Sequence, residues 1–81
     1  MTKEEIIEVI KKHIVENLDD IDENEIEPQK ALSDYGANSL DIIEIVSSSM
    51  RELKIKIPRV ELTDIKNIDE LADKFLQYMN K

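Results

Sequence analysis

The sequence predicts an all-α protein: an antiparallel four-helix bundle made of three principal helices and one short third helix, with a long first loop. Two observations predict this fold class. Apolar residues recur at spacings of three and four in three separate stretches. The one segment that alternates charged and apolar residues, KIKIP at 54–58, is short, ends in proline and has no second strand to pair with, so it is expected to be a connecting loop. The 81 residues are expected to form a single domain over 1–81, because a second core would need more residues than remain.

The first helix is expected over residues 3–18. Thr2 and Glu5 fit a capping box at its start. Its main apolar stripe has a spacing of four and is widened by two further residues: Ile6, Ile10, Ile14 and Leu18, with Ile7 and Val15. His13 is the only histidine and lies off this stripe, so we expect a solvated or half-buried structural role for it rather than catalysis.

The first connection, residues 19–33, is acidic and contains Pro28. Three apolar residues are expected to anchor it: Ile21, Ile26 and Leu32. Connections of this length in compact domains are commonly functional or contain short turns, so we do not treat it as disordered. The run that begins at Asp20 imitates the opening of a calcium loop, but Glu25 stands where glycine is required and Ala31 where glutamate is required. An EF-hand is therefore excluded, and no defined metal site is expected.

The second principal helix is expected to begin at Asn38 or Ser39. Its apolar positions cover a wide arc: Leu40, Ile42, Ile43, Ile45, Val46, Met50 and Leu53. A helix of this kind usually packs on a core and also presents a surface to a partner. Three serines at 47–49 are unusual in the middle of a helix. They indicate either close helix packing, which we favour, or a reshaped cavity suited to a short polar group.

The short third helix is expected over residues 59–65, with Pro58 at or just before its start and Val60 and Leu62 on its buried side. The last helix is expected to begin near Asn67. Its apolar residues recur at spacings of three and four: Ile68, Leu71, Ala72, Phe75 and Met79.

Composition excludes several classes of function. A formal net charge of −8 repels nucleic acid and anionic membrane surfaces, and makes basic protein surfaces the expected partners. The chain has no cysteine, so disulfides, thiolate metal sites and a cysteine nucleophile are excluded. No signal peptide or membrane span is recognisable, and no acid–base or nucleophile triad can be assembled. The expected protein is a cytoplasmic monomer without catalytic activity of its own.

The only glycine, Gly36, stands three residues before Ser39, where a loop must turn into a helix. Glycine tolerates a positive φ or a close backbone approach at such a position. A helix start also leaves backbone N–H groups unsatisfied and carries partial positive charge, so a phosphate on Ser39 would be stabilised by about 0.3–1 kcal/mol. By these arguments alone Ser39, or Asn38 beside it, is more simply an N-cap.

The segment GANSLDIIEIVSSSMRELKIKIP, residues 36–58, resembles the core of acyl carrier proteins, whose attachment motif runs Gly, any residue, Asp, Ser, Leu. The positions that match the family are Gly36, Ser39, Leu40, Asp41, Glu44, Val46 and the pair Ile57 and Pro58. The resemblance implies that Ser39 carries 4′-phosphopantetheine from coenzyme A, and that acyl groups are held on this arm as thioesters. Asn38 departs from the usual aspartate, which leaves open which transferase recognises the protein.

The resemblance also implies partners: a phosphopantetheinyl transferase, and acyltransferases, synthases or other acyl-processing enzymes with basic patches. Leu40, Asp41 and Glu44 become candidate contacts beside Ser39. Farther along, the acidic strip that is usual in the family is interrupted by Arg51, Lys54, Lys56 and Arg59. A mixed surface selects different partners from a uniformly acidic one. The residues Arg51 and Arg59 are therefore further candidate contacts, and they favour a specialised pathway.

The same segment is similar to the discrete carriers of polyketide pathways, which include donor carriers in cassettes that install β-branches by an aldol-type addition of acetyl. Such donors often have an arginine soon after the serine, which this chain lacks at Ile42 and Ile43. Two alternatives stay open. The chain is a carrier for fatty acid synthesis, or it is an unmodified acidic helical adaptor that uses Ser39 only as a cap.

Overall fold

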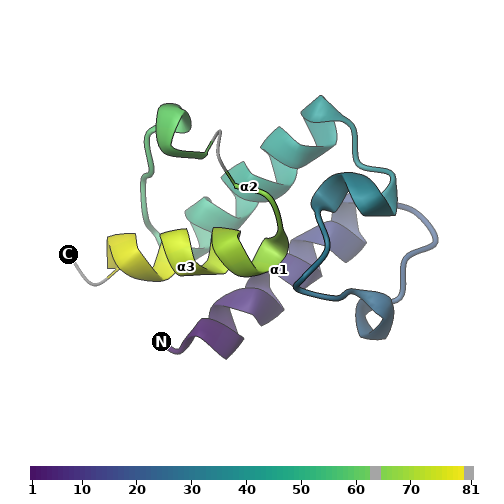
Figure 1. The fold of residues 1–81 in the computed structure, drawn as a ribbon, viewed down its shortest axis with the longest axis horizontal. Coiled ribbons are helices and arrows are strands. Elements are labelled where there is room, and N and C mark those ends of the chain that lie inside the picture. The colour runs from purple at the N-terminus through teal and green to yellow at the C-terminus, as the bar shows by residue number, and fades with distance from the viewer. Residues whose placement is uncertain (63–64, 80–81) are drawn as a thin grey trace.

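The computed structural model describes residues 1–62 and 65–79, and the part of the chain that it describes is helical, without any strand (Figure 1). Its principal helices are α1 (Lys3–Asn17), α2 (Ser39–Leu53) and α3 (Ile68–Met79). Short 3₁₀ helices lie in the connections: η1 (Glu23–Glu25), η2 (Leu32–Tyr35) and η3 (Arg59–Leu62). The predicted all-α class is confirmed, and the short third helix is present as the 3₁₀ helix η3.

The helix α1 lies against both other principal helices, and α2 and α3 each run back along it (Figure 1). Apolar side chains from all three helices and from the connections form one core: Ile6, Ile10, Ile14, Ile26, Leu32, Ala37, Ile45, Val46, Leu53, Ile57, Ile68, Leu71, Ala72 and Phe75. The predicted spacings of three and four therefore correspond to buried faces. Phe75, the only phenylalanine, is fully buried in this core.

The start of α1 is the predicted capping box. The Glu5 N–H donates to Thr2 Oγ1 at 3.2 Å, and the Thr2 N–H donates to Glu5 Oε1 at 2.8 Å. Hydrogen bonding of the Glu5 carboxylate by the Thr2 backbone N–H, and secondarily by the Thr2 side chain, lowers the pKa of Glu5, because it favours the charged form. The helix ends at Asn17, one residue earlier than expected, since Leu18 has extended backbone angles.

Two expectations for α1 were wrong. His13 is only 9% exposed, rather than solvated or half-buried, and Val15 is 37% exposed although we placed it in the apolar stripe. The buried face of α1 is set by two neighbouring helices, and it includes the position of His13 but not that of Val15. His13 is satisfied there because its Nε2 lies 2.9 Å from Oε1 of Glu52 on α2.

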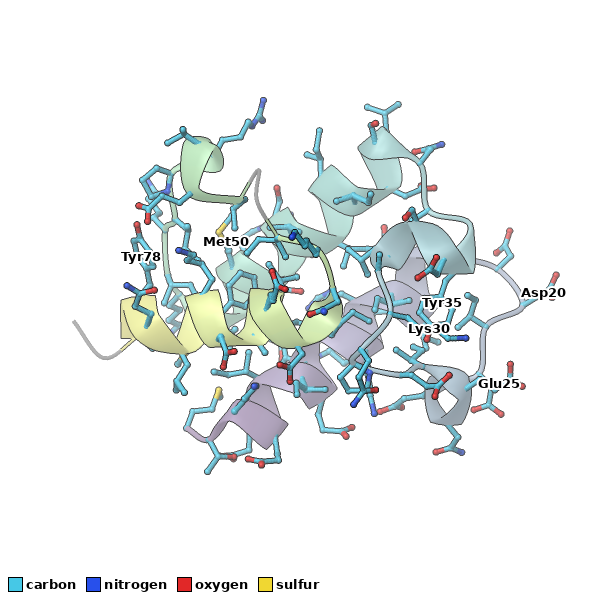
Figure 2. All side chains as sticks on the ribbon, in the orientation of Figure 1. Asp20, Glu25, Lys30, Tyr35, Met50 and Tyr78 are labelled. Carbon is cyan, nitrogen blue, oxygen red and sulfur yellow. The ribbon has the colours of Figure 1, made fainter. Side chains whose placement is uncertain are left out.

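The first connection is held by hydrogen bonds to distant parts of the chain. Tyr35, labelled in Figure 2, accepts a hydrogen bond at its Oη from the Glu27 N–H at 2.7 Å and so anchors the loop. The carbonyls of Pro28 and Lys30 accept from the first amides of α3, at 2.8 and 3.1 Å. The loop therefore supplies hydrogen-bond acceptors for the free N–H groups at the start of α3, in addition to joining α1 to α2.

The connection from α2 to α3 differs in part from the expectation. Segment 55–58 is a loop, as predicted, but η3 ends at Leu62, and residues 63–64 of the expected helix 59–65 lie outside the described residues. Val60 was expected to be buried and is 73% exposed, whereas Leu62 packs against the core. A 3₁₀ helix has about three residues per turn, so side chains two apart point to different sides and one of them faces away from the core.

Candidate functional site

The turn into α2 depends on Gly36, which closes η2 with φ of 86°. A Cβ added at this position would meet no atom within 4 Å. Of the two reasons offered for glycine here, the positive φ therefore applies and the close backbone approach does not. The turn sets the direction in which the next three residues enter the helix.

The N-cap of α2 is Asn38. Its side-chain Oδ1 accepts a hydrogen bond from the Asp41 N–H at 2.8 Å, and the Asn38 N–H donates to Asp41 Oδ2 at 3.1 Å. This reciprocal pair is a capping box, and it satisfies two of the four free amides at the helix start. The cap is therefore made by the neighbouring asparagine, and Ser39 is the first helical residue.

Ser39 is exposed, and its hydroxyl forms no hydrogen bond within residues 1–62 and 65–79. The capping box does not bond the N–H groups of Ser39 and Leu40, so these two amides at the helix start remain without an intrahelical partner. Unsatisfied N–H groups and the helix dipole favour negative charge at this end of α2. An accessible hydroxyl in a positive field is suited to carry a phosphodiester.

Ser39 has no histidine base beside it. The only histidine, His13, is held near Glu52, thirteen residues farther along α2, which corresponds to about 20 Å of helix. Lys12 Nζ lies 2.6 Å from the same Glu52 oxygen, and Lys12 and His13 together lower the pKa of the Glu52 carboxyl. This cluster joins α1 to α2, and it is too far from Ser39 to activate the hydroxyl.

The surface of α2 beside Ser39 combines apolar and charged side chains. Leu40 is 76% exposed, and Glu44 is exposed one turn later. The Ser48 hydroxyl donates to Glu44 Oε1 at 3.2 Å, and Arg51 Nη2 lies 3.9 Å from the same oxygen. Asp41 is half-buried because one of its carboxylate oxygens serves the capping box. The predicted contact residues of α2 thus lie along one helix, with both signs of charge.

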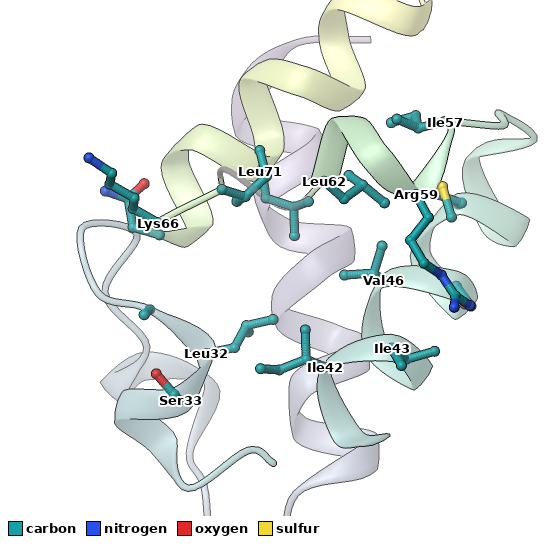
Figure 3. A pocket seen from close by; sticks show the side chains of 15 residues that line it. Leu32, Ser33, Ile42, Ile43, Val46, Ile57, Arg59, Leu62, Lys66 and Leu71 are labelled. Carbon is teal, nitrogen blue, oxygen red and sulfur yellow. The ribbon is translucent and has the colours of Figure 1, made fainter. Parts of the chain in front are cut away.

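A cavity of about 450 Å³ opens between α2, η3 and the segment that leads into α3 (Figure 3). Its α2 side begins with Ile42 and Ile43, three and four residues after Ser39, which is one helical turn. Its interior is mainly aliphatic, with Val46, Leu62 and Leu71 among its lining residues. Figure 3 shows Arg59 and Lys66 on opposite sides of this aliphatic wall.

The three serines of α2 have different environments. Ser49 is fully buried, and its hydroxyl donates to the Ile45 carbonyl at 2.8 Å. Ser47 lines the cavity, and Ser48 bonds to Glu44 at the surface. Ser49 therefore fits the packing explanation, and Ser47 lies at a cavity, although the interior of that cavity is mainly aliphatic.

Sequence reasoning named most of the aliphatic lining residues but did not locate the cavity that they form. It gave no role to Ser33 or Lys66 and used Asn67 only as the start of the last helix, whereas all three line the cavity from outside α2. The one signal available was the serine run, since a small residue at Ser47 indicates space beside the helix. The described residues contain no group of three or more acidic, histidine or cysteine side chains that could hold a metal ion. Every helix among them is too short or too polar to cross a membrane.

An exposed serine at the positive end of a helix, with an apolar cavity one turn away, is an arrangement suited to a helical carrier of a phosphate-linked group. The family model for the phosphopantetheine attachment site matches residues 8–75. The chain is 42% identical over 73 residues to the polyketide biosynthesis acyl-carrier-protein AcpK of Bacillus subtilis, covering 90% of this chain and 89% of that protein. It is 33% identical over 66 residues to the acyl carrier protein of Helicobacter hepaticus, covering 80% and 86%.

Among solved structures, the chain is similar to the carrier in the crystal structure of the curacin biosynthetic pathway HMG synthase in complex with acetyl donor-ACP. The two share 39% sequence identity with a TM-score of 0.84, over 93% of this chain and 96% of that one. The chain belongs to the phosphopantetheine attachment site family and is an acyl carrier protein. Its cofactor is 4′-phosphopantetheine, on which acyl groups are carried to acyl-processing enzymes.

Proposed function

We propose that Ser39 is the residue that carries 4′-phosphopantetheine. The observation that supports this assignment is the capping box between Asn38 and Asp41, which leaves the Ser39 hydroxyl exposed and without a structural partner in the described residues. The adaptor alternative needs Ser39 as a cap, and the cap is Asn38. A phosphopantetheinyl transferase is the partner that installs the arm, and the whole of 1–81 acts as one carrier domain.

When bound, the arm supplies a terminal thiol that holds an acyl group as a thioester. Gly36 and Asn38 fix where α2 begins, and this places the Ser39 oxygen at the surface. The exposed side chains of Leu40 and Ile43 give an apolar path beside the serine, and the cavity that starts at Ile42 offers space for short cargo away from water. The protein itself holds, orients and presents the cargo, and no catalytic step is assigned to it.

The pathway that we propose is polyketide biosynthesis, with this protein as the donor carrier for β-branching. The similarity to AcpK and to the acetyl donor carrier bound to an HMG synthase supports this assignment. Neither Ile42 nor Ile43 is the arginine that the resemblance leads us to expect in such donors. A carrier for fatty acid synthesis is the alternative. A monomer in the cytoplasm fits either pathway.

Partner enzymes are proposed to contact the surface of α2 and η3. Leu40, Asp41 and Glu44 lie nearest to Ser39 along the chain, and Arg51 and Arg59 lie farther away. Exposed apolar side chains supply binding energy, and charges at the rim set orientation and association rate.

Intact-mass measurement tests the assignment of Ser39. The protein is incubated with coenzyme A, magnesium and a broad-specificity phosphopantetheinyl transferase, beside the variants Ser39→Ala and Ser48→Ala. We expect one phosphopantetheine on the parent and on Ser48→Ala, and none on Ser39→Ala. Failure of the folded parent to gain mass with two different transferases would refute the assignment.

The pathway is tested with the acetyl-loaded protein. Incubation with an HMG synthase and a carrier-bound β-ketoacyl acceptor should transfer the acetyl group to the acceptor, which is seen as loss of acetyl mass from this protein. Transfer in a parallel reaction with a fatty acid condensing enzyme, and none with the HMG synthase, would favour the alternative pathway.

A further inference from the structure

Of the ten lysines and arginines that the structure describes, five lysines are paired with carboxylates, and four of the other five lie in one region, with Lys66 the exception elsewhere. Five lysines have a carboxylate oxygen at distances between 2.6 and 3.9 Å: Lys3, Lys11, Lys12, Lys30 and Lys74. Residues 51–60, which we call the basic segment, contain four cations: Arg51, Lys54, Lys56 and Arg59. Within the described parts of the chain, Lys54, Lys56 and Arg59 have no ion-pair partner, and Arg51 has only the long 3.9 Å contact with Glu44.

The one acidic residue of the basic segment does not compensate these charges. Glu52 is turned toward α1, where its Oε1 lies 2.6 Å from Lys12 Nζ and 2.9 Å from His13 Nε2. Its carboxylate therefore pairs with side chains of α1 and not with the cations of the basic segment. The basic segment is a positive region on a protein whose formal net charge is −8.

The backbone of the basic segment directs its cations to solvent. Ile57 is buried and Ile55 is half-buried, so the alternating Lys54 and Lys56 are exposed. Arg59 is exposed at the start of η3, next to the exposed Val60. The segment thus presents charge around an apolar side chain, which is the composition of a protein-docking rim.

Helix electrostatics explain only part of this pattern. Arg51 is in the last turn of α2 and Lys54 is its C-cap, so both are favourable near the negative end of the helix dipole. Lys54 nevertheless has φ of 58°, a left-handed conformation that is usually occupied by glycine and that disfavours other residues by about 1 kcal/mol. Lys56 and Arg59 lie beyond the helix, where its dipole no longer accounts for a cation.

We propose that the basic segment docks on an acidic patch of the acyl-processing enzyme that uses this carrier. This inference rests on the proposed function, under which that enzyme is an HMG synthase. The docking face then carries both signs of charge: Asp41 and Glu44 lie near Ser39, and Arg51 meets Glu44 at 3.9 Å. Lys54, Lys56 and Arg59 follow beyond the far end of α2, about 20 Å from Ser39 along the helix. Opposite charges at the two ends fix one orientation on the enzyme and reject enzymes that are basic throughout.

Binding to the HMG synthase of the curacin pathway tests the inference. The dissociation constant of the unloaded protein is measured by titration at low salt for the parent, for Lys56→Glu with Arg59→Glu, and for the control Lys11→Glu with Lys30→Glu. Both double variants change the net charge by the same amount, and circular dichroism confirms that each is folded. We expect Lys56→Glu with Arg59→Glu to weaken binding by about tenfold or more, with the control within about twofold of the parent.

Three outcomes overturn the proposal: equal binding by parent and Lys56→Glu with Arg59→Glu, equal weakening in both double variants, or no binding of the parent to the synthase. Loading of the parent by the transferase is scored on the same preparation. Because the binding measurement uses unloaded protein, binding without loading would refute the function of Ser39 and leave the docking patch standing. Loading without binding would refute the docking partner alone.

Discussion

At the scale of single residues, Gly36 controls how the chain enters α2, because its φ of 86° is unfavourable for a residue with a Cβ. We expect Gly36→Ala to lower the free energy of unfolding by about 1 kcal/mol. No atom obstructs a Cβ there, so the cost arises from the backbone alone. Gly36→Asn is the matched control, since asparagine adopts the left-handed conformation more readily and should lose less. Urea denaturation measures both, and equal losses would contradict this account.

Glu52 makes a residue-scale prediction about pH. Lys12 and His13 lower the pKa of its carboxyl in the folded protein, so its contribution to stability is present above the ordinary value of 4.5 and is lost as pH falls through the lower folded pKa. We expect Glu52→Gln to be less stable than the parent at pH 5.5, with a difference that shrinks below pH 4.5. Denaturant midpoints across this range measure it.

The control for this prediction is Glu25→Gln, which removes an exposed carboxylate that has no ion-pair partner in the described residues. The difference in stability between Glu25→Gln and the parent should not shrink below pH 4.5 in the way expected for Glu52→Gln. A constant difference between Glu52→Gln and the parent from pH 5.5 to pH 3.5 would show that the cluster is not the cause.

Residue roles could be predicted from the sequence where local backbone chemistry determines them. The need for glycine at 36 and the capping pair of Thr2 and Glu5 follow from neighbours within a few positions. His13 and Val60 were assigned wrongly, because their burial depends on which other element lies against them. That information is distributed over residues distant in sequence, such as Glu52 for His13.

At the scale of elements, the start of α2 depends on its cap. We expect Asn38→Ala to lower the free energy of unfolding by about 1 kcal/mol, because both hydrogen bonds of the capping box are changed or lost. Asn38→Asp should retain the parent stability, since aspartate caps equally well and its charge is favourable at this helix end. Urea denaturation at pH 7 measures both variants. If Asn38→Ala were as stable as the parent, another group would have to cap α2.

The bounds of the principal helices could be predicted closely, because caps and apolar spacing are local signals. The helix α1 ends one residue before the expected position, and α2 begins at one of the two residues considered. The connections were less predictable. Hydrogen bonds from the first amides of α3 to Pro28 and Lys30 cross about forty residues of sequence, and no periodicity records them.

At the scale of the whole molecule, the cavity was the feature least accessible to sequence reasoning. It exists because α2, η3 and the segment before α3 surround one space, and its volume depends on their relative positions. The motif around Ser39 predicted a site of attachment, but it gave no account of the space beside it. The serine at 47 was the only local sign of it.

The whole molecule also makes a prediction from its net charge of −8. At about 10 mM salt the Debye length is roughly 30 Å, which is comparable to the 36 Å long dimension of the molecule, and at 0.15 M it falls to roughly 8 Å. Repulsion among the excess carboxylates therefore extends across the fold only at low salt. We expect the urea midpoint to rise when NaCl is increased from 10 to 150 mM.

A charge variant separates this effect from specific ion binding. Asp19 and Glu25 are exposed in the first connection (Glu25 is labelled in Figure 2), and neither has an ion-pair partner among the described residues. Replacing both by lysine changes the net charge from −8 to −4, because each replacement adds two charges. The rise of the urea midpoint with salt should then be smaller than in the parent. An unchanged rise would mean that salt acts through a particular site, since general repulsion must weaken as the net charge falls.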